Sequence, residues 1–342
     1  MERYNILLTA EVDEAQVEEI YKLGKVTEAG WKKEYKKLEA DELLELIDDT
    51  DILITSYDKV TEKVIDNAPK LKLIACTRSN PVNVDVEAAK RKGIKVIYTP
   101  ERNSDSTAEF AISLMLNIAR NIPMAYKAIK DGEIVMDEPI EQKKDVTWSV
   151  VKGISPYVKY KGVQLKNKTL GIVGYGSIGR RVGNIARGFG MNVLIYDPYV
   201  SEINVDEPGQ KKVDFETLLK NTDFITCHCK VTDVTREMFS KKQFELMKKT
   251  AFFINCSRGG VVKESDLIEA LKRKTIAGAA LDVFENEPLY KDHPFVSGEI
   301  ENIVVTPHIA GATVDSIVNH TKIIIGDIRR YINGEALIYC IT

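Results

Sequence analysis

Short apolar runs alternate with segments of helical spacing along both halves of the chain. In the first half the runs cover residues 4–9, 52–55, 71–75 and 95–98, and helical segments such as 40–48 and 84–92 lie between them. In the second half they cover residues 169–173, 192–196, 224–227, 251–255, 278–281 and 303–305. Continuous apolar runs separated by helices are typical of parallel strands that are buried on both faces. The pattern predicts an α/β protein with two doubly wound parallel sheets.

Two longer helices are predicted outside this alternation. Residues 105–118 form a strongly apolar helix that Ser104 or Asp105 caps, and residues 313–331 form a helix after the last strand. We expect the first helix to connect the two halves and the second to return to the first half. With 342 residues the chain is long for one hydrophobic core. We therefore expect two domains, with the substrate in a cleft between them.

Composition excludes several classes of partner. Apolar residues make up 44% of the chain, charged residues 29%, and the net charge is -3. No apolar stretch reaches the roughly 18 residues of a membrane span, and the lysine pairs are interleaved with acidic residues. We expect neither a membrane nor a nucleic acid as partner. The first residues lack the pattern of a signal peptide, so we expect a cytoplasmic protein.

The five cysteines are odd in number and scattered, which predicts reduced thiols rather than a disulfide framework. Cys227 and Cys229 flank His228. Strand alternation directs this histidine away from both cysteines, and no second ligand cluster lies nearby. We therefore expect no metal site.

A glycine-rich segment follows the first strand of the second half. Gly174, Gly176 and Gly179 lie between the strand at 169–173 and a helix predicted at 178–190, and the next strand ends at Asp197. Glycines at this spacing allow a tight turn, close approach of a pyrophosphate to the backbone, and packing of the helix on the strand. An acidic residue roughly 20 residues further on accepts hydrogen bonds from the ribose hydroxyls. The segment predicts a dinucleotide site that prefers NAD to NADP.

Three polar side chains follow later strands of the same half. Arg258 comes after the strand at 251–255, Glu287 after 278–281 and His308 after 303–305. Ligands bind at the carboxyl ends of parallel strands. An anion-binding guanidinium, a carboxylate and an imidazole at that edge predict acid–base chemistry on an acidic substrate.

Several motifs carry a likeness to a known family. They are Gly-Tyr-Gly-Ser-Ile-Gly-Arg at 174–180, Tyr-Asp-Pro at 196–198, Asn-Cys-Ser-Arg-Gly-Gly at 255–260, Ala-Ala-Leu-Asp-Val-Phe-Glu-Asn-Glu-Pro at 279–288 and Thr-Pro-His-Ile-Ala-Gly-Ala-Thr at 306–313. Shorter matches occur at 83–85, 99–100, Asn103 and 107–109. Together they resemble the D-isomer-specific 2-hydroxyacid dehydrogenase family, and its phosphoglycerate dehydrogenase branch most closely.

The resemblance implies a domain organisation and an activity. A flavodoxin-like substrate domain would comprise residues 1–104 and 313–342, with an NAD-binding Rossmann domain, residues 105–312, inserted into it. The enzyme would interconvert a D-2-hydroxy acid and its 2-keto acid by hydride transfer to or from NAD. Arg258 would bind the substrate's carboxylate or keto oxygen, His308 would exchange a proton with the C2 oxygen, and Glu287 would hold the imidazole.

The resemblance also implies the binding residues. Backbone groups around Arg78, Ser79 and Asn80 would meet the substrate carboxylate. Asp197 would take the adenine ribose and Asp282 the nicotinamide amide. The full cofactor set would be Gly174, Gly176, Ser177, Ile178, Gly179, Asp197, Cys229, Cys256, Asp282 and Gly311.

Departures from the family pattern leave the substrate open. Thr55 and Cys76 stand where the phosphoglycerate branch has groups that hold its anion. Arg78 and Arg102 either supply a new anion contact or are only loop charges. Unless these arginines compensate, we expect 3-phosphoglycerate to be a poor substrate and a small hydroxylated, sugar-acid-like 2-hydroxy acid to be a better one. The direction of the reaction and its regulation are also open.

Two questions of function and assembly complete the expectations. The alternative to an enzyme is a non-catalytic NAD-sensing protein, because corepressors use the same fold. Apolar residues around 110–118 and aromatic residues at 148–160, including Trp148, are expected to be exposed, which predicts a homodimer. The segment 133–166 is longer than the family linker, and its role is open.

Overall fold

The computed structural model describes residues 4–135, 155–202, 205 and 208–342; Trp148 lies outside them. The chain forms two compact units. Unit 1 is Met1–Asn103 with Ala312–Thr342, and unit 2 is Ser104–Gly311, so the chain leaves unit 1 and returns to it. No described helix combines the length and hydrophobicity of a bilayer-crossing segment.

Unit 1 is built on a five-stranded parallel sheet in the order β2-β1-β3-β4-β5. Its strands are β1 (Tyr4–Leu8), β2 (Gly24–Glu28), β3 (Ile52–Thr55), β4 (Leu73–Cys76) and β5 (Lys95–Ile97). Its helices are α1 (Val17–Tyr21), α2 (Trp31–Glu34), α3 (Ala40–Leu44), α4 (Glu62–Asp66), α5 (Val86–Arg91) and α13 (Val314–Ile332). This strand order is that of the flavodoxin-like doubly wound fold.

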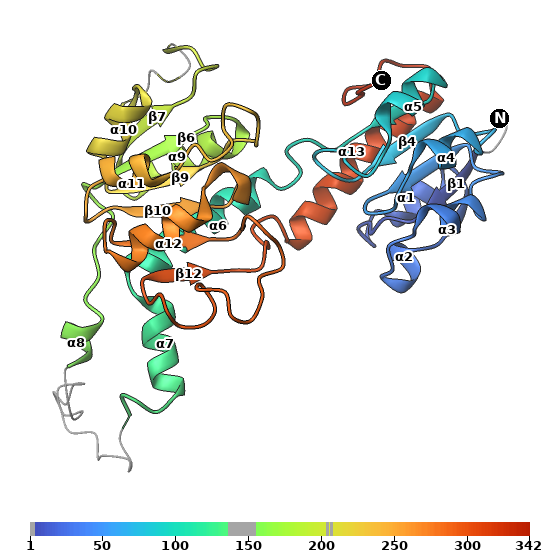
Figure 1. The fold of residues 1–342 in the computed structure, drawn as a ribbon. Helices are drawn as coiled ribbons and strands as arrows, with labels where there is room; N and C mark the ends of the chain where they lie inside the picture. The colour runs from blue at the N-terminus through green and yellow to red at the C-terminus, as the bar shows by residue number, and fades with distance from the viewer. Residues whose placement is uncertain (1–3, 136–154, 203–204, 206–207) are drawn as a thin grey trace. The chain divides into compact units, whose positions relative to one another are not determined.

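Strand alternation gives unit 1 a hydrophobic core on each face of its sheet. Leu7 and Leu53 point to one face, where they pack with residues of α3, α4 and α5. Ile6 and Ile52 point to the other face, where they pack against Ile324 and its neighbours on α13. The C-terminal helix therefore completes the first sheet, as Figure 1 shows.

Unit 2 is built on a seven-stranded parallel sheet in the order β12-β11-β10-β9-β6-β7-β8. Its strands are β6 (Thr169–Val173), β7 (Asn192–Tyr196), β8 (Gln210–Lys212), β9 (Phe224–Cys227), β10 (Phe252–Asn255), β11 (Gly278–Leu281) and β12 (Ile303–Val305). Its helices are α6 (Ser104–Ala119), α7 (Ile122–Lys130), α8 (Pro156–Lys159), α9 (Ser177–Gly188), α10 (Phe215–Asn221), α11 (Lys241–Leu246) and α12 (Glu264–Lys272), with a 3₁₀ turn at Gly259–Val261. The order is that of a Rossmann sheet with one added strand. The sequence order of the strands runs in opposite directions on the two sides of the boundary between β6 and β9.

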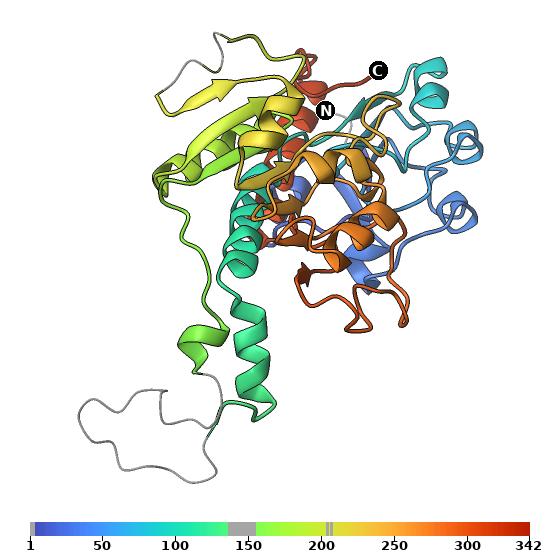
Figure 2. The same ribbon diagram turned by 60° about the vertical axis from the view of Figure 1, so that its left-hand side comes forward.

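The apolar helix α6 belongs to the core of unit 2. Ile112, Met115 and Ile118 pack with Leu170 of β6 and with residues of α9 on one face of the sheet. The expectation that this helix exposes its apolar surface was therefore wrong, because the sheet of unit 2 covers it. The opposite face is covered by α10, α11 and α12. Helices α7 and α8 extend away from the sheet in both views (Figure 2).

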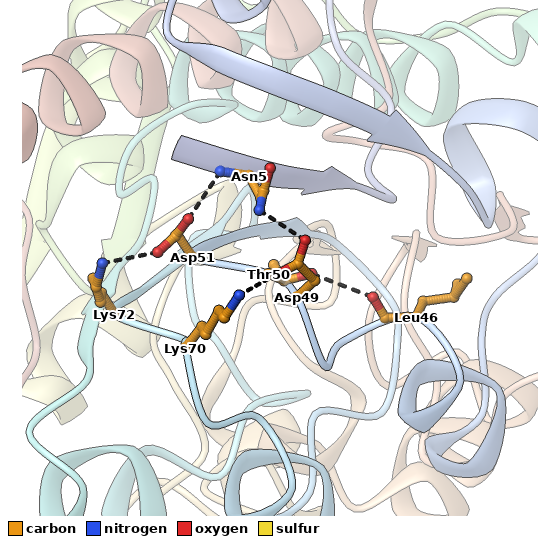
Figure 3. A network of polar contacts seen from close by, with 7 residues as sticks. All are labelled: Asn5, Leu46, Asp49, Thr50, Asp51, Lys70 and Lys72. Atoms are coloured by element: carbon orange, nitrogen blue, oxygen red, sulfur yellow. Dashed lines mark hydrogen bonds and ion pairs between the residues drawn. The ribbon is translucent and has the colours of Figure 1, made fainter. Parts of the chain in front are cut away.

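A polar network joins the amino-terminal ends of the unit 1 strands (Figure 3). Asp51 accepts a hydrogen bond from the Asn5 amide at 2.9 Å and pairs with Lys72 at 2.8 Å. The Asn5 side chain donates to Asp49 at 3.0 Å, and Asp49 also pairs with Lys70. These residues connect the amino-terminal ends of three strands, whereas ligands are expected at the carboxyl ends. We therefore assign the network a structural role.

Candidate functional site

The glycine loop lies where the strand order of unit 2 reverses. Gly174 has a φ of 91°, and a Cβ on it would come within 2.9 Å of the His228 carbonyl group. Its amide donates to the Tyr196 carbonyl at 2.9 Å, and the His228 amide donates to the Val173 carbonyl at 2.8 Å. The turn after β6 is therefore held between β7 and the segment after β9, at the point where doubly wound sheets bind ligands.

The other two glycines have different structural reasons. A Cβ on Gly179 would lie 2.2 Å from the Gly174 carbonyl oxygen, so α9 packs on the turn only with glycine there. A Cβ on Gly176 would meet nothing within 4 Å. Gly176 is the N-cap of α9, and the first backbone N–H groups of a helix have no partner within the helix. The open space beside these donors suits the close approach of a pyrophosphate, as the NAD site requires.

Ser177 and Ile178 form the first turn of α9. The Ser177 hydroxyl lies 2.9 Å from that of Ser104 at the start of α6. Arg181, one turn further on, pairs with Asp105 at 2.6 Å. These contacts fix the start of α9, so that its first amides keep their direction.

Asp197 follows β7 and is half-buried. One carboxylate oxygen accepts from the Tyr175 amide at 2.7 Å, and the other accepts from the Tyr199 amide at 2.8 Å. A carboxylate offers about four acceptor positions, so two remain for the hydroxyls of a ribose. The glycine loop itself thus orients the side chain expected to select NAD.

Two cysteine thiols follow the adjoining strands. The sulfur atoms of Cys229 and Cys227 lie 3.3 Å apart, and all five cysteines of the chain are free. Contact with Cys227 and burial raise the pKa of the Cys229 thiol, and burial raises the pKa of Cys256. Both thiols are therefore neutral at physiological pH. Within the described ranges no group of three or more His, Cys, Asp or Glu side chains is arranged to hold a metal ion.

His308 and Glu287 form a hydrogen-bonded pair. The imidazole Nδ1 lies 2.7 Å from one Glu287 oxygen, and the other oxygen accepts from the Phe284 amide at 3.0 Å. With Glu287 ionised, Nδ1 carries the proton and Nε2 is left for a substrate. Half of the imidazole surface is exposed. The pair thus has the arrangement of an oriented acid–base group.

Asp282 holds the loop that carries His308. The carboxylate is fully buried and accepts hydrogen bonds from Thr306 at 2.6 Å, Ile309 at 2.9 Å and Ala310 at 2.8 Å. His308, between these contacts, has a φ of 57°, which non-glycine residues rarely adopt. The loop ends at Gly311, the last residue of unit 2. The motif at 306–313 did not reveal this positioning role, because two of the three donors are backbone amides, which the identity of a side chain does not mark.

Arg258 follows β10 and is exposed. Its guanidinium donates to the Ser257 carbonyl at 2.6 Å, and the Asn255 side chain holds the Arg258 carbonyl at 3.0 Å. No carboxylate of the described residues lies within 4 Å of it. The loop therefore presents a charge that can bind an acidic substrate.

The residues predicted from unit 2 all lie at the carboxyl ends of its strands, and Arg78, Ser79 and Asn80 follow β4 in unit 1. The Ser79 hydroxyl contacts Asn103 at 3.4 Å. Tyr57 and His320, which no sequence signal singled out, contact Arg78 and Arg102 respectively. They come from distant parts of the chain and meet only in the fold.

Comparison with known proteins agrees with this architecture. Residues 112–310 match the family described as D-isomer specific 2-hydroxyacid dehydrogenase, NAD binding domain. The chain is 39% identical over 332 residues to the D-3-phosphoglycerate dehydrogenase of Methanocaldococcus jannaschii, covering 96% of this chain and 58% of that protein. It is 40% identical over 294 residues to the glyoxylate reductase of Thermococcus litoralis, covering 86% and 84%. This chain therefore spans little more than half the length of the phosphoglycerate dehydrogenase.

A solved structure shows the same fold. A glyoxylate reductase from Paecilomyes thermophila matches with a TM-score of 0.76 and 26% identity, over 100% of this chain and 99% of that chain. The family resemblance, its phosphoglycerate dehydrogenase branch and the two doubly wound sheets are thereby confirmed. The chain belongs to the D-isomer-specific 2-hydroxyacid dehydrogenases, a family of oxidoreductases that use a nicotinamide dinucleotide.

Proposed function

We propose that this protein is an NAD-dependent oxidoreductase that interconverts a D-2-hydroxy acid and its 2-keto acid. The observation that carries the proposal is the 2.7 Å contact between His308 and Glu287, at the strand edge that also carries Arg258 and the glycine loop. Bound NAD supplies the hydride acceptor. A sensor of NAD needs the glycine loop but has no use for an oriented acid–base pair, so the pair favours an enzyme.

The chain's own residues divide the remaining work. The first amides of α9, beside Gly176, bind the pyrophosphate, and Asp197 accepts from the adenine ribose. Cys229 and Cys256 line the cofactor with neutral sulfur atoms. Asp282, which holds the loop of His308, would accept a hydrogen bond from the nicotinamide amide.

Arg258 binds the carboxylate or the keto oxygen of the substrate. In oxidation, His308 Nε2 accepts the proton of the C2 hydroxyl; in reduction, Nε2 returns the proton to the C2 oxygen. Glu287 keeps Nδ1 protonated and stabilises the imidazolium. Unit 1 is the substrate domain, and the backbone around Arg78, Ser79 and Asn80 meets the substrate carboxylate.

The test is a screen of 2-hydroxy acids with NAD and of 2-keto acids with NADH, in which NADH absorbance is followed. Turnover of at least one D-2-hydroxy acid, and not of its L-isomer, is expected. A protein that binds NADH but turns over none of the acids would instead be the non-catalytic sensor.

A homodimer is proposed from the projecting helices of unit 2. Tyr126 of α7 and Tyr157 and Val158 of α8 are largely exposed. A groove of about 780 Å³ between the two segments is lined by apolar residues such as Ile129 together with the polar side chains of Arg120, Lys161 and Gln164. A second copy of this chain would cover this surface. Light scattering at micromolar concentration should give twice the mass of one chain, and the mass of a monomer would contradict the proposal.

The free thiols fit a reducing compartment, so we place the protein in the cytoplasm. Fractionation of cells of the source organism tests this placement.

A further inference from the structure

Two arginines of unit 1 lie close together at the carboxyl ends of β4 and β5. Arg78 follows β4, and its carbonyl accepts from the Thr99 amide at 3.0 Å. Arg102 lies three residues after Thr99. The segments that carry the two guanidinium groups are thus hydrogen-bonded to each other.

A neutral group anchors Arg102. One of its terminal nitrogens lies 3.3 Å from Nδ1 of His320, whose Nε2 lies 2.9 Å from the Glu11 carbonyl oxygen. A carbonyl only accepts, so Nε2 carries the imidazole proton and Nδ1 accepts from the arginine. Burial, and then the charge of Arg102, lower the pKa of His320 to about 4. The ring is therefore neutral near pH 7, and the arginine keeps its charge uncompensated.

Unmade hydrogen bonds concentrate at the same place. The Arg102 Nε is buried without a partner, and so are the hydroxyls of Thr77 and Thr99, which follow β4 and β5. Among the described residues of unit 1, these three atoms are the only buried side-chain nitrogen or oxygen atoms without a hydrogen-bond partner. Buried polar groups are normally paired, so donors left open together indicate a ligand that accepts.

Arg78 is held by an aromatic platform. Its guanidinium lies 5.1 Å from the ring centre of Tyr57, which packs against Trp31 at 5.1 Å. In the described ranges no carboxylate comes within 4 Å of Arg78 or Arg102, and Glu11 acts on Arg102 only at longer range. Burial lowers the pKa of Arg102, and the charge of Arg78 acts in the same direction. An oxyanion bound between Arg78 and Arg102 would offset both the cost of burying the Arg102 charge and its repulsion by Arg78.

We propose that Arg78 and Arg102 form a second anion subsite, which binds the acidic group at the far end of a dianionic 2-hydroxy or 2-keto acid. This proposal rests on the proposed function and names its substrate class. In the proposed function, Arg258 and the backbone around Ser79 and Asn80 already serve the C1 end of the substrate. The guanidinium groups of Arg78 and Arg102 are therefore left for another group. Arg78 and Arg102 would supply the anion contact that Thr55 and Cys76 cannot make. They would then not be merely loop charges.

The test compares substrates that differ only in the far group, with purified full-length protein and saturating NAD. The phosphate arm pairs 3-phospho-D-glycerate with D-glycerate, and the carboxylate arm pairs D-2-hydroxyglutarate with D-2-hydroxypentanoate. The variants are Arg102→Gln, Arg102→Lys and Arg78→Gln. Arg91→Gln is the control, because it removes an exposed arginine of the same unit that pairs with Glu62.

The wild type should prefer the dianion in at least one arm. Arg102→Gln should lower kcat/KM for that dianion roughly 10- to 100-fold, mainly through KM, as the loss of one charge-assisted contact predicts. The monoanion should change little, Arg102→Lys should recover part of the loss, and the control should behave as the wild type. The arm that responds identifies phosphate or carboxylate as the group bound.

Equal losses for the dianion and the monoanion in Arg102→Gln, with an unchanged melting temperature, would overturn the subsite and leave the proposed function standing. So would a wild type that prefers monoanions in both arms. If no acid is turned over, the proposed function fails, and a phosphate titration of the melting temperature judges the subsite separately. Inorganic phosphate should then stabilise the wild type and the control more than Arg102→Gln, and equal stabilisation of all three would overturn the subsite.

Discussion

The variant Gly176→Ala tests whether glycine is needed at this position for cofactor binding or for the stability of the fold. At this position φ is -74° and ψ is -158°, a conformation open to alanine, and no atom beyond the adjacent residues lies within 4 Å of the new Cβ. The free energy of unfolding should therefore change by less than about 1 kcal/mol. The added methyl group occupies the space through which a pyrophosphate approaches the first amides of α9.

The cost to the cofactor follows from the contacts it loses. A charge-assisted hydrogen bond to a phosphate contributes about 1.5–3 kcal/mol, so losing one raises the Kd for NADH roughly 10- to 100-fold. Gly179→Ala is the matched contrast. Its Cβ would lie 2.2 Å from the Gly174 carbonyl oxygen, a backbone atom that cannot yield easily, and overpacking of this kind costs about 1–3 kcal/mol.

Two measurements decide between these effects. Quenching or enhancement of NADH fluorescence gives the Kd, and thermal unfolding without cofactor gives the stability. Gly176→Ala should lose affinity with an unchanged melting temperature, whereas Gly179→Ala should unfold several degrees earlier. Wild-type affinity in Gly176→Ala, or equal destabilisation of both variants, would refute the assignment of the open space to the pyrophosphate.

Four further outcomes test the site and the fold. His308→Ala should lower kcat roughly 10²- to 10⁴-fold with NADH binding nearly intact, whereas Glu287→Gln should move the pH profile of kcat/KM toward lower pH, because the imidazolium loses its partner. Near-normal turnover of His308→Ala would contradict the role of the imidazole. An equal shift of the pH profile in Glu285→Gln, which changes an exposed glutamate nearby, would contradict the role of Glu287. Asp197 should make kcat/KM higher with NAD than with NADP, and equal efficiencies would show that the carboxylate does not select the cofactor. Burial alone would raise the pKa of Asp51, but hydrogen bonds from Lys72 and the Asn5 amide outweigh it and hold the pKa below its ordinary value of 3.8. Asp51→Asn should therefore cost about 1 kcal/mol of stability above pH 5, and urea unfolding should show this difference shrink as the pH falls through 3.8 toward the folded pKa. A difference that stays constant down to pH 3 would count against this reasoning.

The central strands could be predicted from the sequence because burial on both faces makes them continuous apolar runs. The strands at 52–55, 169–173 and 224–227 have the predicted bounds. The edge strands β2 and β8 were missed, since β2 alternates with charged residues and β8 reads Gln-Lys-Lys. Exposed edge strands carry such residues and leave no hydrophobic signal.

The contact between Glu287 and His308 could be anticipated for a similar reason. Parallel strands bring their carboxyl ends to one edge, so Arg258, Glu287 and His308 were expected together before any distance was known. The contacts in unit 1 were not predictable. His320 lies 218 residues from Arg102 along the chain, and only the return of α13 to the first sheet brings them together.

In the proposed function, Asp282 is one side chain that serves both the fold and the chemistry. Its three hydrogen bonds to the loop at 306–310 leave about one of four acceptor positions. That position suffices for one N–H of a nicotinamide amide, as the family pattern implies. Occupation of that position would add a fourth hydrogen bond to the carboxylate that fixes the His308 backbone. Cofactor binding and the placement of the proton-transfer group are then coupled through a single buried charge, and removing this charge should disturb both.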